Sequence, residues 1–166
     1  MKSFLKIILI PLLFLNVVCR KDDEPKVDTT KQKEPPKFQF VKNGEVSFQD
    51  KSKNMISKID VEIAETDEKR HLGLMFREKM DESQGMLFIF QTEELQGFYM
   101  RNTIIPLDII FVNSKKEIVK IHKNTTPFSE QTLPSGKPAM YVVEVNAGYT
   151  DKNKIKEGDL IDWRRN

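Results

Sequence analysis

The sequence contains little of what most metal and redox sites need: one cysteine, two histidines and one tryptophan among 166 residues. A single cysteine excludes an internal disulfide framework and a cysteine-rich zinc site. His71 and His122 lie far apart without a metal-binding spacing, so we expect no metal site and no cofactor. Met75, Met86 and Met100 are soft ligands of the kind that Cu(I) takes, but methionine at apolar positions more often fills a core.

An excess of charge of one sign is also missing. The chain has 27 basic and 25 acidic residues, and the first eighteen residues hold Lys2 and Lys6 but no acid. Beyond that segment the basic and acidic residues therefore balance. A neutral chain lacks the basic surface that captures nucleic acid, so nucleic acid is not an expected partner. The length indicates one domain with a modest core rather than a large enzyme.

The N-terminal segment is typical of an export signal. A basic start precedes an apolar run over residues 7–18, which as a helix is about 18 Å long, against the ~30 Å hydrocarbon core of a membrane. The run ends at Cys19, an arrangement that resembles a bacterial lipoprotein signal. We interpret residues 1–19 as a signal peptide that ends at a lipidated cysteine; cleavage elsewhere and an uncleaved anchor are the alternatives.

A multiply acylated cysteine, which the lipoprotein resemblance implies, anchors a protein stably. We therefore expect the protein to be exported and anchored by lipid to a bacterial membrane, facing the periplasm or the cell exterior. Residues 20–37 are charged, with three prolines and Val27 as the one sizeable aliphatic residue. Such a stretch cannot bury enough apolar surface to order itself, so we expect a disordered tether. Residues 38–166 then form a single folded domain.

From Phe38 onward, short β-like runs alternate with turn residues. Thr66 as N-cap, with acidic residues after it, predicts one short helix near residues 67–76. Gly73 inside this helix suggests that another element approaches closely there. Many short strands and one helix favour a mainly β fold, either a compact antiparallel β-sandwich or a partly closed barrel. The runs predicted as strands are 59–64, 86–90, 108–112, 118–121, 140–145 and 160–163.

Six short strings follow one another in the chain: Gly73-Leu74-Met75 with Arg77, 85–90 (GMLFIF), 98–103 (FYMRNT), 105–111 (IPLDIIF), 143–148 (VEVNAG) and 158–159 (GD). In this order they resemble the domain of unknown function family 192, over roughly residues 55–163. The resemblance implies a compact, mainly β domain that often follows an export signal, and it implies no assigned activity. Tyr99 and Arg101 stand where the family usually has Trp and Lys; Tyr99 keeps a flat face and Arg101 keeps the charge.

Polar side chains interrupt or border these apolar strings, and burying a charge without a partner is costly. We expect them either to pair in a buried network that fixes the fold or to line a ligand cleft beside aromatic side chains. In the first case the charges carry no function. In the second, the ligand-binding residues are Arg77, Tyr99, Arg101, Asn102 and Asp108.

Catalytic residues are not assigned by any motif. Asp108 and Glu144 are the candidates, since two carboxylates serve as acid and base in glycoside hydrolysis. Nucleophilic catalysis has no support, because the sequence lacks a Gly-x-Ser-x-Gly elbow. We favour a non-enzymatic binding or accessory module of the cell envelope, with an unidentified small-molecule or glycan ligand. The alternatives are a small envelope glycan hydrolase and a structural interaction module.

Overall fold

The computed structural model describes residues 38–166, so the expected signal peptide with Cys19 and the expected tether lie outside the described residues. Neither helix of this part is long and apolar enough to span a membrane. The elements are β1 (Gly44–Gln49), β2 (Met55–Ala64), α1 (Asp67–Leu72), β3 (Gln84–Phe98), β4 (Leu107–Val112), β5 (Ile118–His122), β6 (Leu133–Asn146), α2 (Tyr149–Lys152) and β7 (Leu160–Arg165).

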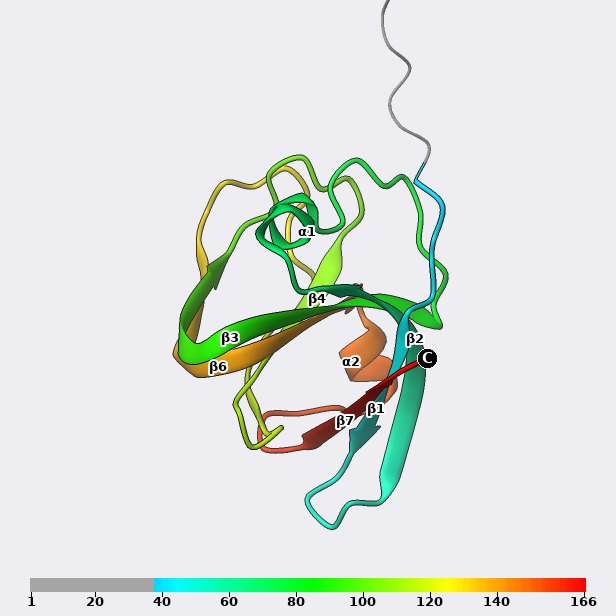
Figure 1. Cartoon of the computed structure of the whole chain (residues 1–166), viewed down its shortest axis with the longest axis vertical. Helices are drawn as coiled ribbons and strands as arrows, with labels where there is room; N and C mark the ends of the chain where they lie inside the picture. Colours follow the sequence, from blue (N-terminus) through cyan, green and yellow to red (C-terminus); the bar gives the residue numbers. More distant parts are fainter. Residues whose placement is uncertain (1–37) are drawn as a thin grey trace, which may run out of the picture. The chain divides into compact units, whose positions relative to one another are not determined.

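All seven strands belong to one sheet in the order β5-β4-β6-β3-β2-β1-β7, which curls into a half-barrel (Figure 1). Its two edges approach each other, since the Ile118 amide donates to the Asp159 carbonyl at 2.8 Å and the Ile161 amide to Lys116 at 2.9 Å. The prediction of a mainly β, partly closed barrel with a short helix is thereby confirmed. The strands are not all antiparallel, because β2 and β3 run parallel.

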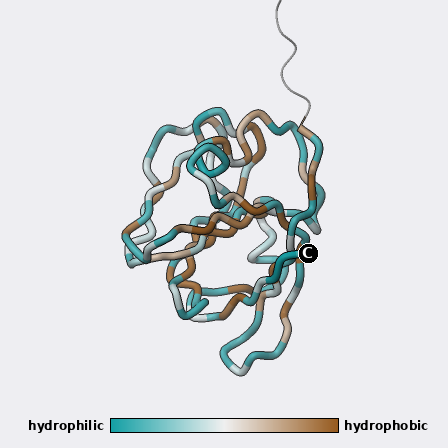
Figure 2. Tube along the Cα trace, in the orientation of Figure 1, coloured by the Kyte–Doolittle hydropathy of each residue, from teal (hydrophilic) through white to brown (hydrophobic). Residues whose placement is uncertain are grey.

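Alternation along the strands sorts the apolar residues onto two faces of the sheet. The inner cluster fills the half-barrel and draws on every strand, with Phe48, Leu87 and Val143 among its fully buried members. The outer cluster lies on the other face of β3, β4 and β6, where Leu74 and Met100 from the loops cover it. Figure 2 shows the hydrophobic segments along the sheet and the hydrophilic ones in the outer turns.

The helix α1 begins as the sequence predicts but ends earlier. Thr66 is the N-cap, and its side chain accepts a hydrogen bond from the Lys69 amide at 3.3 Å. The helix stops at Leu72 because Gly73 turns to a left-handed φ of +48°. A Cβ at Gly73 would lie 3.3 Å from the ring of Phe88, so the approaching element is β3.

Candidate functional site

A cavity of about 300 Å³ opens on the outer face of the sheet, between α1, β3 and the loop that follows β3. Four aromatic side chains line it: Phe88, Phe90, Phe98 and Tyr99. Phe98 meets Phe88 and Phe90 edge-on, with ring centroids 5.1 Å and 6.4 Å away. These contacts hold the wall in place. A concave site of this size with an aromatic wall is typical of small-molecule binding.

Two polar side chains face this cavity with unused hydrogen-bonding capacity. Glu144 of β6 lines it, is 5% exposed, and has no hydrogen-bond partner among residues 38–166. Burial raises the pKa of the Glu144 carboxyl to about 8, against the opposing charge of Arg77. Gln96 of β3 also lines the cavity, and its amide nitrogen is buried without a partner in the same part of the chain. At neutral pH the wall therefore offers a protonated carboxyl and a primary amide to a bound molecule.

Glu144 belongs to a row of side chains that crosses three strands on the outer face. The strand register aligns Glu62 of β2 with Met86 of β3, and Met86 with Glu144. Arg77 is 9% exposed, and the two terminal nitrogens of its guanidinium donate hydrogen bonds to the Glu62 carboxylate oxygens, at 2.9 Å and 2.6 Å. Its guanidinium also lies 5.5 Å from the ring centre of Phe38. The bidentate pair with Glu62 occupies the two terminal nitrogens of Arg77, and its Nε is buried without a partner among residues 38–166. Glu144 forms no ion pair within these residues, although the charge of Arg77 acts on it.

Asp108 lies on the inner face and does not reach the cavity. Its side chain is fully buried and accepts four hydrogen bonds. The donors are the amides of Asn124 (2.9 Å), Gly148 (3.2 Å) and Thr150 (3.0 Å), and the Thr150 hydroxyl (2.6 Å). Because Gly148 is the N-cap of α2 and has no side chain to offer, Asp108 supplies the cap from the neighbouring strand. Its placement is that of a structural acceptor.

The register keeps the two candidate catalytic carboxyls apart. Ile109 pairs with Glu144, and Asp108 pairs with Val145. Directly paired residues share a face of a sheet, and consecutive residues alternate between faces. Asp108 and Glu144 therefore project from opposite faces, and the structure does not bring them together as an acid and base around one substrate.

The remaining predicted ligand residues cluster at the mouth of the cavity. Tyr99 lines it and is 37% exposed. The guanidinium of Arg101 lies 5.0 Å from the centre of the Tyr99 ring, where the two groups stack at the exposed rim. Asn102 is exposed and has a left-handed φ of +59°; its carbonyl accepts the Phe76 amide at 2.8 Å. Tyr99 is thus the one predicted ligand residue in the cavity wall itself.

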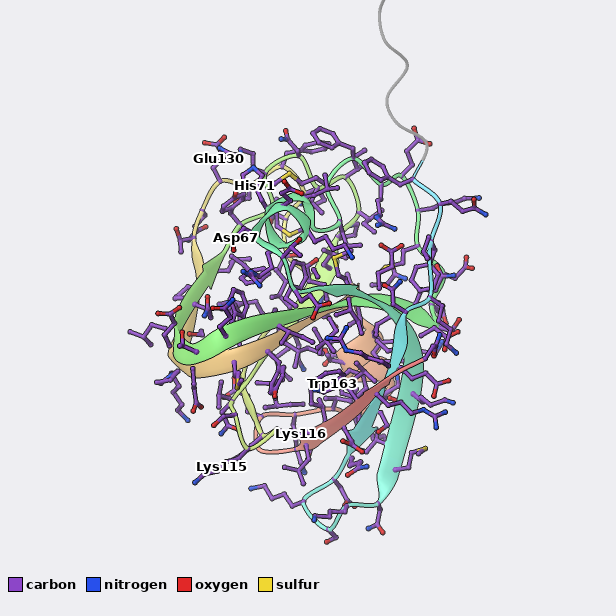
Figure 3. All side chains as sticks on the ribbon, viewed as in Figure 1. Asp67, His71, Lys115, Lys116, Glu130 and Trp163 are labelled. Carbon is purple, nitrogen blue, oxygen red and sulfur yellow. The ribbon has the colours of Figure 1, made fainter. Side chains whose placement is uncertain are left out.

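Several cavity residues were not selected from the sequence. Arg70 of α1 lies over the Phe90 ring at 5.3 Å and donates to the Ile89 carbonyl at 2.8 Å, which fastens the helix to β3. Asp67 and His71 project from α1 at the same end of the domain as Glu130 (Figure 3), and both line the cavity. Within residues 38–166 no three His, Cys, Asp or Glu side chains are grouped so as to hold a metal ion.

The fold and the cavity define a small β half-barrel that carries an aromatic cavity beneath a short helix on its outer face. Residues 48–163 match the family DUF192, described as "Uncharacterized ACR". The chain belongs to this family, which is also named UPF0127.

Curated relatives and solved structures agree with this assignment. A UPF0127 protein of Pyrococcus furiosus is 32% identical over 113 residues, which cover 65% of this chain and 90% of the relative. The crystal structure of a Sinorhizobium meliloti protein, described as a proposed transcription regulator, is 33% identical with a TM-score of 0.70, covering 75% of this chain and 98% of that one. A Novosphingobium aromaticivorans protein of unknown function is 35% identical with a TM-score of 0.68, covering 72% and 84%.

Proposed function

We propose that the folded domain is a binding module that holds an uncharged, ring-shaped polar molecule, of the N-acetylated sugar kind, in the cavity beneath α1. The observation that carries this proposal is Glu144, a buried carboxyl that has no hydrogen-bond partner in the described part of the chain and lies in an aromatic-walled cavity. Buried polar groups are nearly always hydrogen-bonded, so an unpaired one in a cavity indicates where a ligand would bind. Phe98 and Tyr99 supply flat apolar surface, and Glu144 and Gln96 supply directed hydrogen bonds.

The ligand class follows from the chemistry of the wall. A protonated carboxyl and a primary amide both donate to carbonyl and hydroxyl oxygens. An N-acetylated sugar presents such oxygens on its edge and an apolar face for stacking. Asp67 pairs with Arg70, so with Glu144 protonated the charges of the lining balance, and an uncharged ligand fits it.

The test is a thermal-shift titration of the domain with N-acetylglucosamine. We expect the melting temperature of the wild-type protein to rise with sugar concentration by mass action. Glu144→Leu removes the hydrogen-bonding group and is expected to abolish the rise. Glu78→Leu, the same change at an exposed position, is the matched control and should respond as the wild type does. No rise at millimolar concentrations of this sugar, or an equal rise in Glu144→Leu, would contradict the proposal.

We also propose that the module is exported and anchored by lipid at Cys19, in the periplasm or on the cell exterior. The support is the basic start, the short apolar run and the position of the sole cysteine directly after that run. The family match begins at residue 48, so these features lie outside the matched domain. The charged stretch 20–37 provides the spacing that a tethered domain needs.

The anchor predicts a change in fractionation when the cysteine is replaced. We expect full-length Cys19→Ala to move from the membrane fraction to the soluble fraction and to lose incorporation of labelled fatty acid. Val18→Ala leaves the cysteine in place and should remain in the membrane fraction. If Cys19→Ala stays entirely with the membranes, the lipid anchor is wrong.

The described function of the Sinorhizobium relative is not carried over to this chain. Transcription regulators bind DNA through an excess of basic charge. Here the basic and acidic residues beyond the first eighteen are balanced. The proposed partners are therefore a membrane and a small molecule or glycan, without nucleic acid.

A further inference from the structure

Large apolar side chains gather on α1 and on the loops at the same end of the domain. Five of them are exposed, Phe128 most of all at 62% and Phe76 next at 42%. Their loops are joined by backbone hydrogen bonds, from Phe76 to the Asn102 carbonyl (2.8 Å) and from Phe128 to the Thr103 carbonyl (3.2 Å). Figure 1 shows these loops together around α1. We name this surface the loop-tip patch: Leu72, Phe76, Tyr99, Ile104 and Phe128.

The backbone holds the two phenylalanines outward at an energetic cost. Phe76 has a φ of +63° and Phe128 a φ of +59°, in the left-handed region that bulky residues rarely adopt. Asn or Gly would occupy these positions with less strain, and the exposed rings gain no core burial in return. Backbone strain that holds an apolar ring on the surface, with no gain in core packing, indicates that the ring contacts something outside the domain.

We propose that the loop-tip patch inserts into the interface of a lipid bilayer. The first described residue, Phe38, lies against Arg77, the neighbour of Phe76, so the chain enters the domain at the patch end. Residues 20–37, fully extended, span about 60 Å. If Cys19 carries the lipid, as proposed above, the tether joins the domain at the patch end. A tether of this length gives the patch a high effective concentration at the bilayer. A weak affinity for lipid is then enough to keep the patch inserted.

The charges around the patch favour apolar insertion over attraction to anionic lipid. The exposed acidic and basic residues within four positions of it in the sequence are three of each sign: Glu68, Glu78, Glu130, Lys69, Lys79 and Arg101. Tyr99 and Arg101 carry polar groups on apolar stems, and such side chains suit the headgroup level of a membrane. Binding should therefore need no anionic lipid. A protein partner is the competing occupant, and vesicles of lipid alone distinguish the two.

The experiment uses residues 38–166 without any anchor. This segment contains both apolar clusters, and the Sinorhizobium structure, matched over 98% of its length, shows that the fold stands without an N-terminal extension. We expect the segment to float with vesicles of phosphatidylcholine and phosphatidylethanolamine. Phe76→Asn with Phe128→Asn keeps the backbone conformation, because Asn tolerates positive φ, and should lower the partition coefficient at least tenfold.

The matched control removes exposed apolar side chains elsewhere. Met55 and Leu95 are 67% and 70% exposed and lie outside the patch, so Met55→Asn with Leu95→Asn should stay within twofold of the wild type. As a second readout, the added emission of Phe128→Trp should shift to the blue with vesicles, whereas that of Met55→Trp should not. Failure of the wild-type segment to float in excess lipid, without a blue shift, overturns the proposal and leaves the patch to a protein partner.

The failures of the separate proposals are distinguishable. A wrong lipid anchor appears in the fractionation of Cys19→Ala and leaves vesicle flotation of residues 38–166 unchanged. A wrong ligand appears in the thermal-shift titration, because neither Phe76 nor Phe128 lines the cavity. Loss of flotation alone removes only the membrane-docking role of the patch.

Discussion

Asp108→Ala is expected to lower the free energy of unfolding by about 3–5 kcal/mol. The substitution removes the acceptor of four hydrogen bonds and leaves the amides of Asn124, Gly148 and Thr150 without partners. Each unsatisfied buried donor costs about 1–3 kcal/mol, and hydrogen bonds to a charged group are the stronger ones. The start of α2 and the loop after β5 are expected to loosen together. Urea unfolding of residues 38–166 at pH 7 measures the loss.

The control for Asp108 is a carboxylate of the same type on the surface. Asp162 on β7 pairs with Lys116 at 2.5 Å, but its side chain is 58% exposed. Exposed ion pairs contribute roughly 0–1 kcal/mol, so Asp162→Ala should change little. Asp108→Asn keeps one acceptor oxygen, so its loss in free energy of unfolding should lie between those of Asp162→Ala and Asp108→Ala. A loss below about 1 kcal/mol for Asp108→Ala would mean that Asp108 does not hold the fold, and the placement as a structural acceptor would be wrong.

The elements that the sequence predicts well are those with a strong local signal. The capped start of α1 and the apolar runs of β3 and β4 appear where local chemistry places them. β1 was not predicted, because its alternation consists of only Val46 and Phe48 among polar residues. It is held as a strand between two partners, β2 next to it in the sequence and β7 more than a hundred residues away.

The predicted helix continues past the observed end of α1, because apolar side chains keep a helical spacing beyond that end. Leu72, Met75 and Phe76 recur at helical spacing, yet the chain leaves the helix at Gly73. The reason is tertiary, since the ring of Phe88 packs where a longer side chain at residue 73 would lie. The helical pattern therefore continues beyond the residues that the fold allows to be helical.

The sequence predicts which charged residues of the site are buried, but not which face of the sheet each one takes. A charge within an apolar run must be buried, and Arg77, Asp108 and Glu144 are 9%, 0% and 5% exposed. Which face each carboxyl takes depends on strand register, and register is not readable from one sequence. Glu62, the partner of Arg77, occupies a polar position of an alternating strand and resembles a solvated residue. Gln96 lies in a polar run and gives no signal of lining a cavity.

Glu144→Gln is expected to stabilise the protein in a strongly pH-dependent way. Burial raises the pKa of the Glu144 carboxyl from 4.5 to about 8. Between these values the folded protein keeps a proton that the unfolded chain has released, so the free energy of unfolding falls as pH rises. One pKa unit corresponds to about 1.4 kcal/mol, so the loss approaches 4–5 kcal/mol by pH 8. Gln is neutral throughout, so the variant should match the wild type below pH 4.5 and be several kcal/mol more stable at pH 8.

Urea unfolding from pH 4 to pH 8.5 measures this difference, with Glu78→Gln as the control for the same change at an exposed position. The charged groups around Glu144 are Arg77, which pairs with Glu62 and opposes the rise in pKa, and Asp67, Arg70 and His71 at the cavity. Equal pH dependence in the wild type and in Glu144→Gln would mean that water or a cation already satisfies the carboxyl, and the binding proposal would lose its main support. If the free energy of unfolding falls with rising pH in the wild type and in Glu78→Gln but not in Glu144→Gln, then the Glu144 carboxyl lowers the stability of the fold at neutral and basic pH. Such a cost is characteristic of a functional site, because a well-packed apolar side chain would serve the fold better.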